Sequence, residues 1–255
     1  MNNPTTRFSN RVDNYVKYRP GYPQEVLRLL AEKCGFTRQT VVADVGSGTG
    51  IFTKVLLDHG NRVWAVEPNA AMRTAAEQIL AGYEGLTSVD GTAEATTLPD
   101  HCVPLVTVAQ ALHWFDPAPT RAEFRRILQP GGWVAVFWNE RHLDATPFLR
   151  DYEVLLETFG TDYAQVRHSN LDVERVRAFF GSEAVELTVL KNRQVFDYEA
   201  LEGRLLSSSY APDETKPSHQ PMLERLKAIF AVHQVDGQVA FDYDLNVYTG
   251  QLGDG

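Results

Sequence analysis

Apolar and polar residues alternate along the first half of the chain in a rhythm that predicts strands and helices in turn. Short, nearly continuous apolar runs bounded by turn residues are typical of strands buried on both faces of a parallel sheet. Such runs occupy residues 41–45, 63–66, 86–89 (the weakest), 103–109 and 133–138. Each is therefore predicted to be a strand.

The segments between these runs carry apolar residues at helical spacing. Pro23 suits the first turn of one helix, and Asn69 suits the cap of another. Thr120 and Glu123 have the form of a capping box ahead of an apolar stretch. The regular alternation of strand and helix predicts an α/β layered sheet with right-handed crossovers.

Beyond Asn139 the rhythm changes. Helical patterns dominate residues 146–182, and they return near 198–208 and 221–234, after a strand expected around 185–190. Residues 241–248 alternate in the manner of a late antiparallel strand. Segments 146–182 and 195–236 are therefore expected to be insertions at the edges of the sheet, where such elements commonly cover a ligand site.

Composition narrows the class of protein. The 255 residues suit one elaborated domain, and 44% hydrophobic residues are enough for a sizeable core. The formal net charge of −9 argues against nucleic acids and anionic membranes as partners. No signal peptide or bilayer-spanning apolar segment is visible. We expect a cytoplasmic enzyme that is a monomer or homodimer.

The most informative motif is a glycine turn that follows the first buried strand. Gly46, Gly48 and Gly50 lie between that strand and a helix, an arrangement that brings backbone N–H groups close to a ligand. A dinucleotide-binding turn would place its third glycine at position 51, which is Ile51. The spacing therefore disfavours a nicotinamide cofactor.

Two acids beside this turn indicate the charge of the ligand. Asp44 precedes the first glycine by two residues, and Glu67 ends the second strand. A carboxylate at this place suits the ammonium and sulfonium of S-adenosylmethionine better than an anionic pyrophosphate. Glu67 is placed to accept hydrogen bonds from ribose hydroxyls. The alternative is that both are solvated acids at strand ends, which the glycine turn between them disfavours.

The glycine turn, its two acids and the segments that follow resemble the class I S-adenosylmethionine-dependent methyltransferases, in particular the methyltransferase type 11 group. The similarity rests on five blocks in the expected order, at residues 41–50, 66–72, 91–94, 109–116 and 128–132. Residues 15–20 are similar to small-molecule members, including the trans-aconitate methyltransferase-like branch. Beyond about residue 145 the similarity is weak.

The resemblance implies a Rossmann-like, seven-stranded, mostly parallel sheet with an antiparallel last strand and helices on both faces. We expect one methyltransferase domain over 1–255, with an N-terminal lid and first helix in 1–40, a cofactor-binding core in 41–145, and acceptor-side helices in 146–182 and 195–236. The residues expected to bind S-adenosylmethionine, or its product S-adenosylhomocysteine, are Arg19, Asp44, Gly46, Ser47, Gly48, Gly50, Glu67, Pro68, Thr92, Ala93, Glu94 and Gln110.

One position in the expected cofactor site departs from the family. Members often carry an aspartate before the alanine of the adenine-side loop, where this chain has Thr92. The contact with the adenine amino group is then left to the Thr92 hydroxyl, to Glu94 or to a backbone carbonyl. Arg19 is expected to pair with a carboxylate of the cofactor or of the acceptor, with a plain surface arginine as the alternative.

Methyl transfer needs a base only when the acceptor must lose a proton. His113, after the fourth strand, is the candidate base because an imidazole titrates near neutrality. Packing against the cofactor is the alternative role and the one we favour. The remaining candidates line the acceptor pocket: Tyr15, Tyr18, Trp114, Asn139 and Tyr210. No spacing of histidine or cysteine indicates a metal site.

The sequence thus predicts a methyltransferase that moves a methyl group from S-adenosylmethionine to a small molecule, with a carboxylate or hydroxyl oxygen as the suggested acceptor. Two other functions stay open at this point. One is a nicotinamide-dependent oxidoreductase, and the other is a non-catalytic protein that keeps the same cofactor-binding fold.

Overall fold

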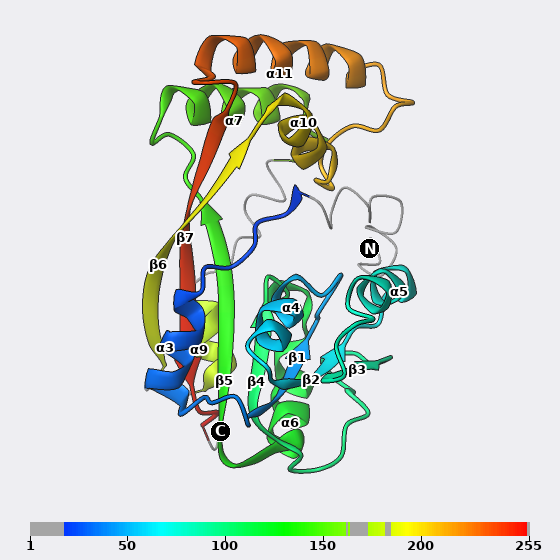
Figure 1. Cartoon of the computed structure of the whole chain (residues 1–255), viewed down its shortest axis with the longest axis vertical. Helices are drawn as coiled ribbons and strands as arrows, with labels where there is room; N and C mark the ends of the chain where they lie inside the picture. Colours follow the sequence, from blue (N-terminus) through cyan, green and yellow to red (C-terminus); the bar gives the residue numbers. More distant parts are fainter. Residues whose placement is uncertain (1–17, 162, 164–172, 182–184, 254–255) are drawn as a thin grey trace.

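Seven strands of the described chain form one mixed sheet. The computed structural model describes residues 18–161, 163, 173–181 and 185–253 (Figure 1). The strands lie in the order β3-β2-β1-β4-β5-β7-β6, where β7 is antiparallel to both of its neighbours. Their bounds are Val41–Val45 (β1), Arg62–Val66 (β2), Leu86–Val89 (β3), Val103–Ala109 (β4), Leu128–Arg141 (β5), Glu186–Phe196 (β6) and Val239–Gly250 (β7). The predicted Rossmann-like sheet with an antiparallel last strand is confirmed.

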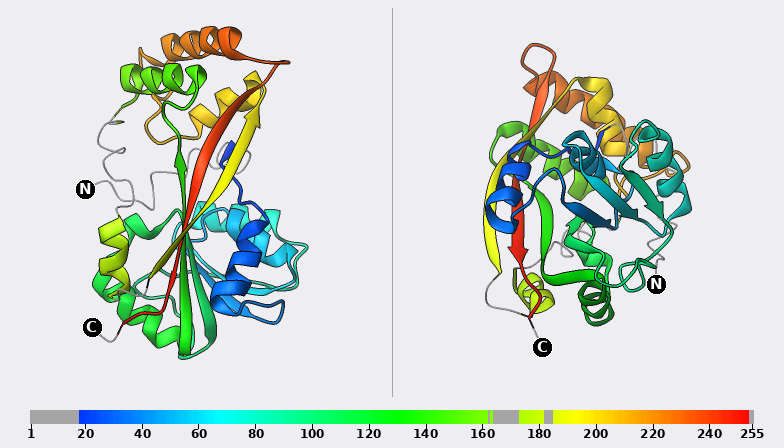
Figure 2. Two further views of the ribbon diagram at one scale, coloured as in Figure 1. Left: turned by 90° about the vertical axis from the view of Figure 1, so that its left-hand side faces the viewer. Right: turned by 60° about the horizontal axis from the view of Figure 1, so that its bottom comes forward.

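Helices cover both faces of this sheet, as the edge-on view in Figure 2 shows. Helices α3 and α4 pack on one face, where they share a core with Val42, Leu105 and Phe137. Helices α6 and α9 pack on the other, against Val106 and Val136. The helices are α3 (Glu25–Cys34), α4 (Ile51–Asp58), α5 (Ala70–Ile79), the short 3-10 helix η2 (Leu112–Trp114), α6 (Pro117–Ile127), α7 (Pro147–Phe159), α9 (Val173–Phe180), α10 (Tyr198–Leu206) and α11 (His219–His233).

A second layer of helices stands beyond the parallel strands. Strands β5, β6 and β7 continue past the carboxyl ends of β1 and β4, and α7, α10 and α11 gather around their far ends (Figure 1). Phe241 on β7 is buried there among aromatic neighbours that include Phe148 and Tyr152 of α7. The far ends of these three strands thus form the floor of a separate apolar core.

One predicted helix cap is confirmed, and another is wrong. The Asn69 side chain caps α5 by accepting from the backbone N–H groups of Ala71 and Met72. The capping box at Thr120 and Glu123 is incorrect, because α6 already begins at Pro117. The Glu123 carboxylate instead accepts from the N–H and hydroxyl of Thr96, on a distant loop. A long-range hydrogen bond has taken the side chain that the local pattern assigned to a cap.

The second half of the chain differs from its prediction in the lengths of the strands. β5 extends three residues beyond 138, and β6 runs to Phe196, so the expected insertion at 195–236 begins in its last two residues. Helix α9 packs with α6 on a face of the sheet, apart from α7, α10 and α11. No helix in the described part of the chain combines the length and apolar character needed to span a bilayer.

Candidate active site

The glycine turn has the backbone conformation that its glycines predict. Gly46, Gly48 and Gly50 have φ values of 71°, 59° and 83°, a left-handed region that side chains with a Cβ rarely adopt. The N–H groups of Gly46 and Ser47 both donate to the carbonyl of Val66, at 2.9 and 3.1 Å. This fastens the turn after β1 to the end of β2, directly before Glu67.

Glu67 faces this turn and is held there by backbone donors. Its carboxylate accepts from the N–H of Gly48 at 2.9 Å and from the N–H of Asn69 at 2.8 Å. The residue is 7% exposed. Burial raises the pKa of Glu67, while those two N–H groups and the nearby Arg73 oppose the rise. Because each carboxylate oxygen has a second lone pair, Glu67 retains the capacity to accept from a ligand's hydroxyls.

Asp44 lies beneath the turn instead of reaching out of it. Its side chain is fully buried and accepts from the hydroxyls of Thr53, at 2.6 Å, and Thr107, at 2.9 Å. These bonds join β1 to α4 and β4. Burial raises the pKa of Asp44 to about 6, with a smaller contribution from the nearby Glu67 and with the two threonines opposing it. Two neighbouring carboxylates, Asp44 under the turn and Glu67 facing it, therefore create a negative potential there.

The turn also presents polar atoms that have no partner in the described part of the chain. The hydroxyls of Ser47 and Thr49 are buried without a hydrogen bond. A Cβ built on Gly48 would meet only the sulfur of Met72, at 4.0 Å. Unsatisfied buried hydroxyls are uncommon in native proteins and call for a partner. Together with Asp44 and Glu67, they fit a polar ligand that carries positive charge.

The expected adenine-side loop follows β3, which is separated from β1 by β2. Ala93 is buried in the sheet core, while Thr92 is exposed and pairs through its backbone with Ala95. The Glu94 carboxylate accepts from the N–H of Asp116 at 3.0 Å. Pro68 is half-buried between Glu67 and Asn69. Since the Glu94 side chain already binds the loop after η2, the Thr92 hydroxyl is the freer of the two candidates for an adenine contact.

The end of β4 carries a second backbone strain and the candidate base. Gln110 has a φ of 58°, although it is not glycine, and its side-chain amide donates to the carbonyl of Asn139 at 3.3 Å. The His113 ring lies 4.5 Å from the ring of Trp114 and 5.1 Å from that of Trp138. Burial, with a smaller effect of Arg175, lowers the pKa of His113 to about 4. Its imidazole is therefore neutral at physiological pH.

The expected acceptor-side residues are spread over three segments. Tyr15 lies outside the described residues. Tyr18 and Arg19 both contact the α10 region, the ring of Tyr18 against Gly203 and the Arg19 guanidinium at 3.1 Å from the carbonyl of Ser207. The Asn139 side-chain oxygen accepts from Asn192 of β6 at 2.8 Å. Trp114 is 40% exposed, and the Tyr210 ring packs 4.9 Å from that of Tyr163.

Sequence reasoning missed one buried and one largely buried arginine near these residues. Arg141 ends β5, and Arg204 lies in α10 with 7% of its surface exposed. No sequence motif joins them, because they are far apart in the chain. The alternation of β5 is the one available signal, since Arg141 shares a strand face with the predicted Asn139 two residues earlier.

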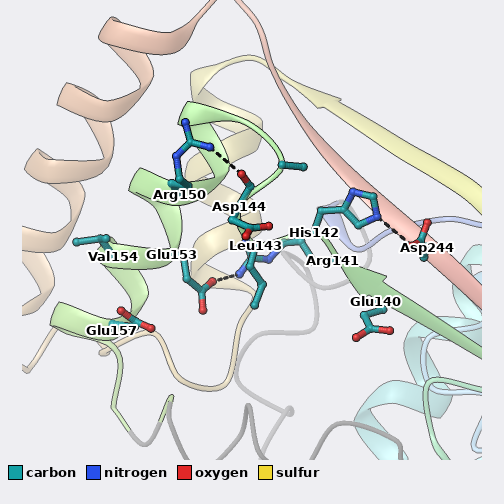
Figure 3. A pocket seen from close by; sticks show the side chains of 11 residues that line it. Glu140, Arg141, His142, Leu143, Asp144, Arg150, Glu153, Val154, Glu157 and Asp244 are labelled. Carbon is teal, nitrogen blue, oxygen red and sulfur yellow. Dashed lines mark hydrogen bonds and ion pairs between the residues drawn. The ribbon is translucent and has the colours of Figure 1, made fainter. Parts of the chain in front are cut away.

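An open pocket of about 790 Å³ lies beside Arg141, between the end of β5 and α7 (Figure 3). None of the predicted site residues lines it. Its lining is Glu140, Arg141, His142, Leu143, Asp144, Ala145, Arg150, Glu153, Val154, Glu157 and Asp244. Among the described residues, no three histidine, cysteine or acidic side chains gather as metal ligands.

The buried Asp44 leads to a first prediction, on pH. The pKa of about 6 in the folded chain exceeds the usual aspartate value, so Asp44 takes up a proton as the pH falls through that range. A cationic ligand prefers the ionised form. Its affinity is thus expected to fall by up to about tenfold per pH unit below about pH 6 and to be level above it. Calorimetric titration with S-adenosylmethionine between about pH 5 and about pH 7 measures this.

The variant Asp44→Asn isolates the contribution of this carboxyl. Glu67, whose pKa is also raised by burial, acts in the same direction, so some pH dependence is expected to persist in the variant. The slope is nevertheless expected to be shallower than in the wild type. Equal slopes would show that Asp44 does not respond to the ligand's charge.

Known proteins are similar to this chain in sequence and in fold. A family model described as a methyltransferase domain matches residues 43–136. The chain is 30% identical over 226 residues to an uncharacterized methyltransferase of Mycobacterium tuberculosis. The aligned region covers 89% of this chain and 86% of that relative. The chain is 27% identical over 156 residues to an uncharacterized methyltransferase-like protein of Schizosaccharomyces pombe, covering 61% of this chain and 59% of that one.

Solved structures with a similar fold extend over nearly the whole chain. A protein of Anaeromyxobacter dehalogenans, provisionally named a type II methyltransferase, superposes with a TM-score of 0.64 at 22% identity and covers 92% of this chain and 98% of its own. A phosphoethanolamine N-methyltransferase of Haemonchus contortus, solved with phosphomonomethylethanolamine and S-adenosylhomocysteine, gives 0.56 at 13% identity, covering 94% and 56%. At these identities the similarity concerns the fold.

Proposed function

The chain belongs to the class I S-adenosylmethionine-dependent methyltransferases, and on that premise we propose that it methylates an oxygen atom of a small-molecule acceptor. The observation that carries the donor assignment is the pair of buried carboxylates, Asp44 and Glu67, at a turn of left-handed glycines. A dinucleotide pyrophosphate would be repelled by this pair. The matched family likewise favours a methyltransferase over a nicotinamide-dependent oxidoreductase.

Each part of the donor has a matching part of the turn and its neighbours. Glu67 would accept from the ribose hydroxyls, while Gly46 and Gly48 let the backbone approach the methionine moiety. Ser47 and Gly50 complete that turn, with Asp44 beneath it supplying negative potential. The loop of Thr92, Ala93 and Glu94 would flank the adenine, with Pro68 and Gln110 beside it. Arg19 would pair with the carboxylate of the methionine part.

The chemistry requires alignment more than proton transfer. When bound, S-adenosylmethionine supplies a methyl carbon activated by its sulfonium: an acceptor oxygen forms the C–O bond with a lone pair, the C–S bond breaks, and sulfur keeps the electrons as a thioether. The chain's task is to hold the acceptor in line and to exclude water. The far ends of β5, β6 and β7, with α7 and α10, would hold the acceptor and exclude water.

The environment of His113 bears on the acceptor atom. A general base works best with a pKa near the working pH, and the pKa of His113 is lowered to about 4 by burial. A hydroxyl acceptor needs its proton removed, whereas a carboxylate is already ionised at neutral pH. A weak base at this place supports a carboxylate oxygen as the acceptor, with His113, Trp114 and Trp138 forming a wall of the site.

Replacement of His113 by phenylalanine tests this assignment. As a wall residue, His113 contributes shape, so kcat is expected to fall by no more than about tenfold, with an unchanged pH profile near neutrality. Removal of a general base would instead cost about a hundredfold or more. Steady-state rates from about pH 6 to about pH 8 decide between the roles. A loss above a hundredfold that is restored by added imidazole would identify His113 as the base.

Transfer of a labelled methyl group tests the proposed function itself. The wild-type chain is incubated with methyl-labelled S-adenosylmethionine and with matched sets of carboxylic acids, alcohols, thiols and amines. Label is expected to appear as base-labile methyl esters of carboxylic acids. Exclusive labelling of amines or thiols would contradict an oxygen acceptor, and the absence of transfer from a donor that binds would favour a non-catalytic protein.

A further inference from the structure

Two arginine side chains, one buried in α10 and one largely buried at the end of β5, lie beside the helical layer without full compensation of their charge. Arg204 in α10 is 7% exposed, and the Arg141 side chain at the end of β5 is 12% exposed. Within the described chain, the Nε of Arg204 and the Nη1 of Arg141 have no hydrogen-bond partner. Burial of a guanidinium is costly unless its charge and its donors are satisfied. Each of these guanidiniums therefore keeps one buried donor nitrogen without a partner among the described residues.

One carboxylate neutralises part of this charge. The Arg141 Nη2 lies 2.5 Å from Glu153 Oε2, and Figure 3 shows this pair reaching between β5 and α7. The Tyr163 hydroxyl binds the same carboxylate at 2.7 and 2.8 Å. Arg204 forms no ion pair with any described residue, and its Nη1 donates to the Ser208 hydroxyl at 3.1 Å. The pair thus keeps one uncompensated positive charge.

Tyrosine rings lie near the two guanidiniums, and the positive charge of the guanidiniums lowers the pKa of one tyrosine hydroxyl. The Arg141 guanidinium lies 5.3 Å from the centre of the Tyr152 ring. Burial alone would raise the pKa of Tyr210, but Arg204 and Arg141, with smaller effects of Ser208 and Arg19, lower it below its ordinary value. Positive potential from three arginines therefore converges on the Tyr210 hydroxyl, although the chain as a whole carries a formal net charge of −9.

The position of the pair relative to the glycine turn follows from the strand register. Ala109, near the end of β4, is level with Phe137 of β5, and Arg141 lies four residues farther along β5. At about 3.3 Å per residue, that is about 13 Å beyond the edge of the sheet where the donor is expected. A short acceptor would span this distance from the donor's methyl group to Arg141.

We propose that Arg141 and Arg204 bind a carboxylate or phosphate group of the methyl acceptor, distinct from the oxygen that is methylated. This inference rests on the proposed methyl transfer. A guanidinium on the reacting oxygen would weaken it as a nucleophile, whereas a remote anionic group only anchors the acceptor. Planar guanidiniums bind both types of oxyanion through paired N–H donors. The acceptor is therefore a small molecule with at least one anionic anchor.

The open pocket of Figure 3 is a separate feature. Arg141 and its ion-pair partner Glu153 line this pocket, but Arg204 does not. The other acidic residues of the lining are Glu140, Asp144, Glu157 and Asp244. That lining would repel an anion. The anion site is instead assigned to the surroundings of Tyr210, on which both arginines act.

Binding of simple anions to the chain loaded with S-adenosylhomocysteine tests the proposal. Calorimetric titrations use glutarate, glycerol 3-phosphate and, as a neutral analogue of similar shape, glutaramide. At least one of the two anions is expected to bind at millimolar concentration, and glutaramide is not. Which anion binds more tightly distinguishes a carboxylate anchor from a phosphate anchor. If neither anion binds, or if glutaramide binds equally well, the proposal is overturned.

Matched variants connect that binding to the arginine pair. Arg204→Gln and Arg141→Gln are each expected to weaken anion binding about tenfold or more, the value of a charge-assisted hydrogen bond. Arg204→Lys is expected to retain part of it, and Arg225→Gln, at an exposed position of α11, all of it. Equal anion affinity in wild type and both glutamine variants would contradict the assignment.

The affinity for S-adenosylhomocysteine distinguishes a failure of the proposed arginine site from a failure of the proposed methyl transfer. It is expected to stay within about twofold of the wild-type value in all these variants, which also reports that they are folded. Loss of anion binding with intact S-adenosylhomocysteine binding supports the arginine site. Failure of the wild-type chain to bind S-adenosylhomocysteine would instead contradict the proposed function.

Discussion

The variant Glu67→Ala is expected to bind S-adenosylhomocysteine about a hundredfold more weakly than the wild type. The carboxylate is 7% exposed and faces the glycine turn, where two backbone N–H groups hold it. Hydrogen bonds from two ribose hydroxyls to a charged acceptor contribute about 3 kcal/mol together, which corresponds to that change in affinity. Isothermal titration calorimetry with S-adenosylhomocysteine measures the loss directly.

Two further variants make this result specific. Glu67→Gln keeps the shape but replaces one acceptor oxygen with a donor, so an intermediate loss is expected. Glu77→Ala removes an exposed carboxylate on the neighbouring helix α5 and is expected to leave the affinity unchanged. If Glu67→Ala bound S-adenosylhomocysteine as tightly as the Glu77 control, Glu67 would have no role in the donor site.

The variant Gly46→Ala is expected to lower the free energy of unfolding by about 3 kcal/mol. The backbone at Gly46 has a φ of 71°, which is strained for alanine, and the new Cβ would lie 2.6 Å from the Cβ of Ala111 and 3.0 Å from the Phe115 ring. Such overlap forces the turn away from β4. Urea denaturation curves measure the loss, and the displaced turn is expected to bind S-adenosylhomocysteine poorly.

Gly131→Ala provides a matched control for the backbone strain. Gly131 has a φ of 76°, close to that of Gly46, but no atom lies within 4 Å of its hypothetical Cβ. Its substitution is expected to cost about 1 kcal/mol, the price of the left-handed conformation alone. Equal losses in the two variants would show that close packing against Ala111 and Phe115 contributes nothing to the turn.

The parallel half of the sheet could be predicted from sequence because its signals are local. A buried strand such as β1 is a short apolar run, and the turn that follows places its three glycines within five residues. Glu67 ends a similar run, so its position near the turn follows from two adjacent parallel strands. For these residues, neighbours in the sequence are also neighbours in the structure.

The errors arise where distant segments determine the structure. Glu123 has the spacing of a helix cap, yet its carboxylate binds Thr96, which no local pattern reveals. The extension of β5 to Arg141 carries polar residues that pair with β7, whose sequence lies about a hundred residues later. Arg141 and Arg204 act on the same tyrosine, Tyr210, only because of this pairing and the placement of α10. The acceptor side was consequently the least predictable part.

Burial changed the interpretation of two residues whose chemistry had been inferred from their type. His113 was a candidate base because imidazole ordinarily titrates near neutrality, but its surroundings lower its pKa to about 4. Asp44 was expected, by its residue type and place, to complement the ligand's positive charge; it lies fully buried under the turn, with its pKa raised by burial to about 6. The sequence identifies which side chains can titrate, but the surroundings of each side chain in the fold determine its pKa and therefore its charge.

The identity of the bound cofactor is the most direct test of the account. Parallel calorimetric titrations of the full chain with S-adenosylmethionine, S-adenosylhomocysteine and NADH compare the candidates under one condition. Both adenosyl compounds are expected to bind at micromolar concentration, with affinity reduced by Glu67→Ala, and NADH is expected not to bind. Micromolar binding of NADH without binding of either adenosyl compound would contradict the assignment of the glycine turn.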